Sequence, residues 1–195
     1  PSVPTDVIGQ VASASVADID LALQTATAWS ATPLERGETL KRAANLFEKN
    51  DGELFALLTR EAGKTLPDTV SELREAVDFL RYYAGEIHQA PALGLVTCIS
   101  PWNFPLAIFT GQIAAALTAG NAVLAKPANQ TPLIAYFATC LLHQAGVPRS
   151  ALQLLPGDGT VGAALTGSAR VDGVAFTGST QTAKTIHVKM AEILT

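Results

Sequence analysis

Residues 99–112, ISPWNFPLAIFTGQ, decide the fold, together with the apolar residues that lead into them. Pro101 and Pro105 fix the backbone and remove two N–H donors, so an extended strand that enters this stretch ends here. Pro105 suits the first turn of a helix, and the spacing that follows predicts a helix over residues 105–119. Asn103 is therefore held on a stiff turn between the carboxyl end of a strand and a helix, where open α/β sheets bind ligands. The alternative is that Asn103 only caps the helix.

Apolar runs and helical patterns alternate through the second half of the chain. Strands are predicted at residues 94–100, 121–126, 151–156 and 171–178, each followed by a helix. This alternation predicts an α/β fold with a doubly wound parallel sheet. Right-handed crossovers would place the carboxyl ends of all these strands at one edge of the sheet.

The first half of the chain is typical of helices that lead into such a sheet. After an extended arm over residues 1–14, helical spacing begins at Ser15, Pro33, Asp51 and Pro67. Thr32 and Glu35 form a capping box, and Gly63 is suited to end a helix. We therefore divide the chain into an arm with a helical lead-in, residues 1–92, and an incomplete sheet domain, residues 93–195.

The composition excludes some classes of function. The formal net charge is −4 and no basic run is present, which argues against a nucleic-acid partner. No apolar run is long enough to span a bilayer and no signal peptide is visible, so we expect a cytoplasmic protein. Charged residues make up only 15% of the chain, against about 25% typically, which predicts that further chain or a partner domain covers part of the surface.

The cysteines and histidines indicate neither a metal site nor a disulfide. Cys98 and Cys140 lie in apolar segments without a CxxC neighbour, so we interpret both as small core residues and not as nucleophiles. His88, His143 and His187 lie on helical patterns without partners at metal-ligand spacing. We interpret them as surface or helix-end residues.

Glycines and one lysine follow the predicted strands at the carboxyl edge. Gly157, Gly159 and Gly162 fit GxGxxG after a strand, but the acidic residue expected about 20 positions later is absent, so the motif alone is weak. A flexible turn is the alternative. Lys126 follows an apolar strand directly, where its amine suits phosphate or ribose oxygens; a solvated strand end is the alternative.

The last strand ends in FTGST, residues 176–180, which places hydroxyls and amides at a helix start. Thr177, Gly178 and Ser179 would make an anion site there, although a plain Ser N-cap explains Ser179 alone. Since Asn103, Lys126 and the glycine turn are predicted at the same edge, a dinucleotide cleft is the better joint explanation.

These motifs also carry a family resemblance. The segments ISPWNFP, AGNAVLAKPANQTP, GVP, LLPGDG and VAFTGST occur in the order and approximate spacing of the aldehyde dehydrogenase superfamily. REAGKTLPD and EAVDFLRYYA are most similar to the glutamate-semialdehyde (pyrroline-5-carboxylate) dehydrogenase module of bifunctional proline-utilisation flavoenzymes. The resemblance covers nearly the whole chain and implies oxidation of glutamate semialdehyde to glutamate with NAD, by a parent enzyme that forms homo-oligomers.

The resemblance also implies roles for individual residues. Asn103 would stabilise the oxyanion, Lys126 would bind the adenosine ribose, and Ser179 would contact the pyrophosphate. Other cofactor contacts would come from Ile99, Ser100, Pro101, Trp102, Asn129, Gly159, Gly162, Phe176, Thr177 and Gly178. Glu61 and Phe104 would lie near the aldehyde.

The chain departs from the family pattern at four places. Asn129 replaces a Glu that accepts from ribose hydroxyls, so NADP use is possible beside NAD. The glycine turn is one residue shorter than GxGxxxG, and the segment between Ala84 and Leu93 lacks the family's longer hairpin segment. The family's general base and nucleophilic cysteine would both lie beyond Thr195, so we expect this chain to be inactive. The alternatives are a dehydrogenase for another aldehyde and a short nucleotide-binding protein without catalysis.

Overall fold

The computed structural model describes residues 5–86 and 91–193. In chain order the elements are α1 (Val16–Thr25), α2 (Pro33–Lys49), α3 (Asp51–Ala62), α4 (Leu66–Gly85), β1 (Leu95–Ile99), α5 (Ala107–Thr118), β2 (Ala122–Lys126), α6 (Pro132–Ala145), β3 (Leu152–Leu154), α7 (Gly159–Thr166), β4 (Gly173–Phe176) and α8 (Thr180–Ile193). None of the helices within these residues is long and apolar enough to cross a membrane.

The four strands form one parallel sheet in the order β3-β2-β1-β4, which confirms the predicted doubly wound α/β fold. The chain runs outward from β1 through β2 to β3, then crosses to the other side of β1 to form β4. Ile99 at the end of β1 pairs in register with Lys126 on β2 and with Phe176 on β4. The last residues of three strands therefore form one row at the carboxyl edge.

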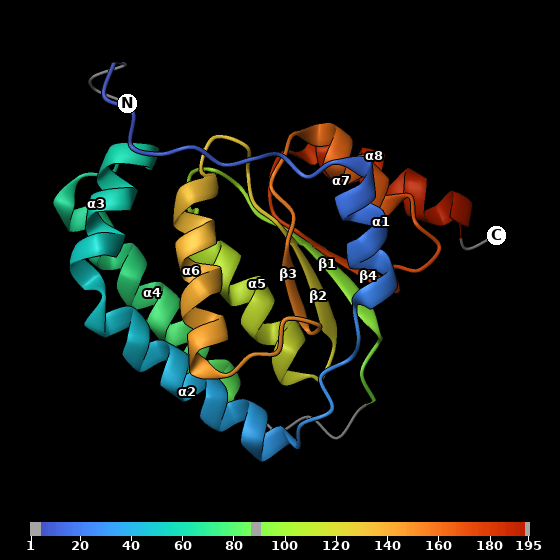
Figure 1. Cartoon of the computed structure of the whole chain (residues 1–195), viewed down its shortest axis with the longest axis horizontal. Helices are drawn as coiled ribbons and strands as arrows, with labels where there is room; N and C mark the ends of the chain where they lie inside the picture. Colours follow the sequence, from blue (N-terminus) through green and yellow to red (C-terminus); the bar gives the residue numbers. More distant parts are fainter. Residues whose placement is uncertain (1–4, 87–90, 194–195) are drawn as a thin grey trace.

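Alternate side chains of the strands face two separate cores. Val96, Cys98 and Val123 pack with α5, α6 and the lead-in helices α2, α3 and α4. Leu95 and Leu124 pack on the opposite face with α1 and α7. Figure 1 shows the sheet between these two groups of helices, with α2, α3 and α4 forming the outermost layer on one side.

The lead-in helices follow from local signals that the sequence displays. Thr32 and Glu35 form the predicted capping box at the start of α2. Gly63 ends α3 with φ +71°, a left-handed conformation that favours glycine because it has no Cβ. Gly111 on α5 is needed for close packing, because a Cβ there would lie 2.8 Å from the ring of Phe79 on α4.

Some helix and strand boundaries in the structure differ from those predicted from the sequence. Helix α5 begins at Ala107, so Pro105 lies in the turn before the helix and not in its first turn. The last strand covers residues 173–176 instead of 171–178, and the carboxylate of Asp172, directly before it, accepts from the N–H of Leu95. His88 and part of the short segment after Ala84 lie outside the described residues.

Candidate functional site

The carboxyl edge of the sheet holds a cavity of about 660 Å³ at the point where the strand order reverses between β1 and β4. This is the position where doubly wound sheets bind ligands. The predicted site residues that line this cavity are Ser100, Pro101, Trp102, Asn103, Phe104, Lys126, Asn129, Phe176, Thr177, Gly178 and Ser179. The expected direction of the strands placed Asn103, Lys126 and residues 177–179 together, and the family resemblance added the others.

A second cavity, of about 680 Å³, lies between α7 and α8. It is lined by the remaining predicted cofactor residues, Ile99, Gly159 and Gly162, and by apolar side chains of α8. Lys126 and Thr182 line both cavities, so the two cavities are adjacent. We refer to the two adjacent cavities as the groove; its part between α7 and α8 is more apolar than its part near Asn103.

Lys126 is an unusual lysine because only 7% of its surface is exposed. Burial lowers the pKa of its amine, while the negative charge of Asp158 acts in the opposite direction. None of the ion pairs within residues 5–86 and 91–193 involves Lys126. A buried amine without an ion-pair partner in a groove is suited to an oxygen-rich ligand.

The glycine turn begins α7 beside this lysine. Asp158 caps the helix by accepting from the N–H of Thr160 at 2.8 Å, and hydrogen bonds from Thr160 hold the pKa of its carboxyl below the ordinary value. A Cβ on Gly159 would meet nothing within 4 Å, so this residue faces open space at the helix start. Gly162 faces Ile99 and the stem of Lys126. The backbone of this glycine turn therefore lies close to the groove.

The hydroxyls predicted as ligand contacts near β4 have partners in the protein. Ser179 caps α8, because its Oγ accepts from the N–H of Thr182 at 3.1 Å. The Thr177 hydroxyl accepts from Nε2 of Gln112 on α5 at 3.0 Å. By contrast, the Ser100 hydroxyl at the end of β1 is buried and has no hydrogen-bond partner among the described residues. Ser100 and Ser179 both line the first cavity, and the side chain of Ser179 is the more exposed.

Asn103 does not cap α5, so the alternative interpretation from the sequence is wrong. The N-cap residue is Leu106, and its side chain makes no hydrogen bond to the start of the helix. Instead, one carboxylate oxygen of Glu72, on α4, accepts from the N–H groups of Leu106 and Ala107 at 2.8 and 3.3 Å. The side chain of Asn103 is exposed and lines the first cavity. Since it does not cap α5, helix capping does not account for an asparagine at this position.

Glu61 has a structural role that the sequence did not reveal. Its two carboxylate oxygens accept from the N–H groups of Leu133 and Ile134 at 2.8 and 2.9 Å, at the start of α6. Burial raises the pKa of the Glu61 carboxyl, and these two hydrogen bonds oppose the rise. Thr131, the N-cap residue of α6, makes no side-chain cap hydrogen bond. The role of Glu61 near the aldehyde stays a prediction.

Neither cysteine has the features of a nucleophile. Cys98 is 1% exposed, and burial raises the pKa of its thiol to about 12, so the reactive thiolate is suppressed. Cys140 lies half-buried on α6, where it is not fully in the core as predicted, and lines neither cavity. Nδ1 of His143 donates to the carbonyl of Val147 at 2.9 Å near the end of α6, and His187 is exposed on α8. No metal-binding cluster of His, Cys, Asp or Glu occurs within residues 5–86 and 91–193.

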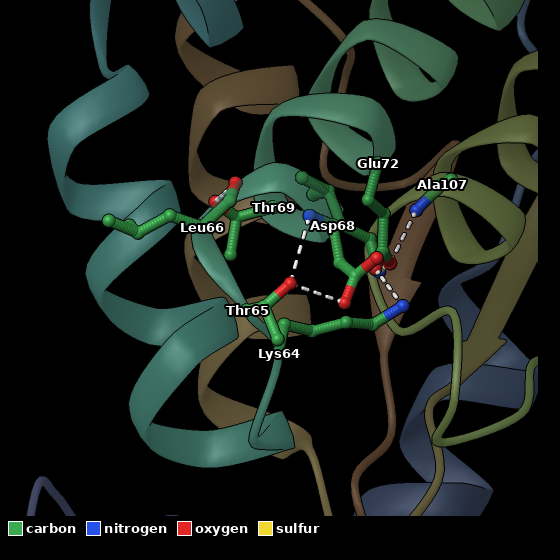
Figure 2. A network of polar contacts seen from close by, with 8 residues as sticks. Lys64, Thr65, Leu66, Asp68, Thr69, Glu72 and Ala107 are labelled. Atoms are coloured by element: carbon green, nitrogen blue, oxygen red, sulfur yellow. Dashed lines mark hydrogen bonds and ion pairs between the residues drawn. The ribbon is translucent and has the colours of Figure 1, made fainter.

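Sequence reasoning missed Lys64, Glu72 and Gln112, because each acts on an element distant in the chain. Nζ of Lys64 lies 2.8 Å from a carboxylate oxygen of Glu72 and 4.1 Å from the ring centroid of Phe104. Figure 2 shows Lys64 and Glu72 pointing toward one another, with Glu72 beside the backbone of Ala107. The signal available for Glu72 was that it is an acidic residue at a buried position of a helix.

Comparison with known proteins agrees with this geometry. The model described as "Aldehyde dehydrogenase family" matches residues 1–195. The chain belongs to the aldehyde dehydrogenase family. The family resemblance drawn from the motifs is thereby confirmed.

Three similar proteins illustrate how members of the aldehyde dehydrogenase family relate to the chain. The bifunctional protein PutA of Escherichia coli K12 is 53% identical over 206 residues, covering 100% of the chain and 16% of PutA. The 1-pyrroline-5-carboxylate dehydrogenase of Anoxybacillus flavithermus is 37% identical, covering 99% of the chain and 42% of that protein. A crystal structure of Staphylococcus aureus betaine aldehyde dehydrogenase in complex with NAD+ has a TM-score of 0.90 and 29% identity, covering 97% of the chain and 44% of that structure. The chain thus spans less than half the length of each.

Proposed function

We propose that this chain forms the cofactor-binding part of a longer enzyme that oxidises L-glutamate γ-semialdehyde to L-glutamate with NAD. The substrate is inferred from the identity to PutA and to 1-pyrroline-5-carboxylate dehydrogenases. The observation that carries the cofactor is the groove made by two adjacent cavities that Lys126 lines. The complete enzyme is this chain together with the additional sequence that its longer relatives contain.

The groove fits a dinucleotide by its shape and its polar groups. The hollow between α7 and α8 offers apolar walls for an adenine ring, and Lys126 at the junction offers a cation for ribose or phosphate oxygens. Asn129 lines the first cavity and carries no charge, so we propose NAD as cofactor with NADP as a tolerated alternative.

The residues of this chain would orient the cofactor and stabilise the oxyanion, while groups elsewhere in the complete enzyme would carry out the covalent chemistry. When bound, NAD supplies the hydride acceptor. Asn103 donates its amide N–H to the oxygen that becomes negative when a thiolate attacks the aldehyde carbon. Ser100, Pro101 and Trp102 shape the wall of the cavity beside it. The thiolate and the base that hydrolyses the thioester are proposed to lie in the additional chain.

Three further expectations belong to this proposal. The boundary between the lead-in and the cofactor domain would lie near residue 92, although both parts contribute to one core. The complete enzyme would form homo-oligomers. It would be cytoplasmic, which is compatible with the lack of a membrane-spanning helix within the described residues.

The substrate is tested by turnover of the complete enzyme with NAD. We expect glutamate semialdehyde to have a kcat/KM well above that of propionaldehyde or betaine aldehyde, which lack its carboxylate. A preference for an uncharged or cationic aldehyde would contradict the proposed substrate while leaving the family and the cofactor groove unaffected.

We expect the 195-residue chain by itself to be inactive. Its buried Cys98 is held as a thiol and Cys140 lies away from the groove, so neither cysteine can attack an aldehyde positioned beside Asn103. The measurement is NADH formation from glutamate semialdehyde by the purified chain. Turnover that disappears in the Asn103→Ala variant would contradict this prediction.

Replacement of Lys126 by Ala in the complete enzyme should raise the KM for NAD with little change in kcat. Lys126 lies at the junction of the two cavities, so its contact would be equally strong in the ground state and the transition state. Steady-state kinetics with varied NAD checks this, and Lys49→Ala, an exposed residue at the end of α2, is the control. A large loss of kcat at saturating NAD with unchanged KM would reject the binding role.

A further inference from the structure

The carboxylate of Glu72 is the most deeply buried acidic side chain near the site. Its side chain is 1% exposed, although glutamates are almost never fully buried without partners. One oxygen accepts from Leu106 and Ala107, and the other is paired with Lys64. Figure 2 shows the side chain of Lys64 and the backbone nitrogen of Ala107 both directed at the carboxylate of Glu72.

The position of Glu72 completes a helix end that the local sequence leaves open. Helix α5 starts without a side-chain cap from its own N-cap residue, Leu106. The first N–H groups of a helix have no partner within the helix, and a negative charge there is stabilised by the helix dipole. Glu72 satisfies both requirements from a position 34 residues earlier in the chain.

Lys64 extends this contact to the other side of the turn. Its amine lies 4.1 Å from the centroid of the Phe104 ring, within the range of a cation–π interaction, while it pairs with Glu72. The turn from Pro101 to Leu106 is therefore held at Phe104 and at Leu106. Asn103 lies directly before the first of these two points, with its side chain exposed to the cavity.

We infer that Glu72, together with Lys64, is a positioning residue that holds the turn carrying Asn103 in the geometry needed for the oxyanion. The inference rests on the proposed function, because the role of Glu72 depends on Asn103 being the donor to the oxyanion. It also makes a claim about the chain alone, namely that the backbone at residues 103–107 is ordered by Glu72. Two experiments test these two claims separately.

The first experiment measures amide hydrogen exchange in the 195-residue chain. Glu72→Ala should speed exchange at residues 103–107, and Glu72→Gln, which keeps an acceptor but loses the charge, should do so to a smaller extent. Exchange in β2 should stay unchanged in both variants. Glu75→Ala, an exposed glutamate on the same helix, is the matched control and should leave both segments unchanged. Unchanged exchange at 103–107 in both Glu72 variants would overturn the inference.

The second experiment is a double-mutant cycle on kcat in the complete enzyme. Glu72→Gln should lower kcat by about 10- to 100-fold, since small misplacement of a catalytic group has effects of this size. In an Asn103→Ala background the same change should lower kcat little further, because the group that Glu72 positions is already absent. An equal fall in both backgrounds would mean that Glu72 does not act through Asn103, and would overturn the inference. Absence of aldehyde oxidation by the unmodified enzyme would instead refute the proposed function, and the exchange experiment would still decide the ordering of the turn.

Discussion

Replacement of Asn103 by Ala in the complete enzyme should lower kcat about 10²- to 10³-fold, or roughly 3 to 4 kcal/mol of transition-state stabilisation. A donor to a developing oxyanion acts mainly in the transition state, so the KM for the aldehyde should change much less than kcat. The structure removes the competing explanation, because Glu72 and not Asn103 bonds the first N–H groups of α5. The melting temperature of Asn103→Ala should therefore stay near that of the unmodified protein.

Asn121 provides the reciprocal control for this prediction. Its amide is buried, accepts from the N–H of Gly94 at 3.0 Å and donates to the carbonyl of Ala116 at 3.0 Å. Asn121→Ala leaves the N–H of Gly94 without this acceptor, while the carbonyl of Ala116 still accepts from the backbone N–H of residue 121. The substitution should therefore lower stability by about 1–3 kcal/mol while the folded enzyme keeps its kcat. Thermal unfolding and kcat measured for both variants give the comparison. A lowered melting point with near-normal turnover for Asn103→Ala would reject the oxyanion role.

Replacement of Lys64 by Met should lower the free energy of unfolding of the chain by about 3 kcal/mol. Methionine keeps an apolar stem of similar length but removes the cation that compensates the Glu72 carboxylate. The two side chains are only 14% and 1% exposed, so water cannot replace the lost partner readily. A buried charge left without its partner is one of the few causes of so large an effect from a single substitution.

Lys41→Met is the matched control, since Lys41 also pairs with a glutamate, Glu38, at 2.9 Å. Both of those side chains are about half exposed, so their ion pair is screened by solvent and its loss should have no measurable effect. Urea unfolding of the two variants beside the unmodified chain checks the prediction. Equal effects of the two substitutions would show that burial of the Lys64–Glu72 pair is unimportant for stability.

The carboxyl-edge site illustrates how much of the arrangement could be predicted. Asn103, Lys126 and Thr177 are far apart in the chain, yet each directly follows a strand or ends one. Since parallel strands with right-handed crossovers end at the same edge, their alternation with helices was enough to bring these residues together. Of the residues to which the resemblance gives a role, all except Glu61 line one of the two adjacent cavities.

The sequence by itself determined the features that depend on neighbouring residues. The capping box at Thr32, the end of α3 at Gly63 and the alternation of strands and helices all follow from local spacing, because their hydrogen bonds and dihedral preferences involve residues a few positions apart.

Only the tertiary structure decided which side chains cap the two helices that cover the sheet. Local pattern suggested Asn103 as the cap of α5, and Thr131 is the N-cap residue of α6, but the carboxylates of Glu72 and Glu61 on the lead-in helices bond the first N–H groups of these helices. A carboxylate carries a full charge and two acceptor oxygens, so it satisfies two N–H groups and the helix dipole better than a neighbouring hydroxyl or amide. Whether such a carboxylate reaches a helix end depends on how α3 and α4 pack against α5 and α6, and no local pattern contains that information.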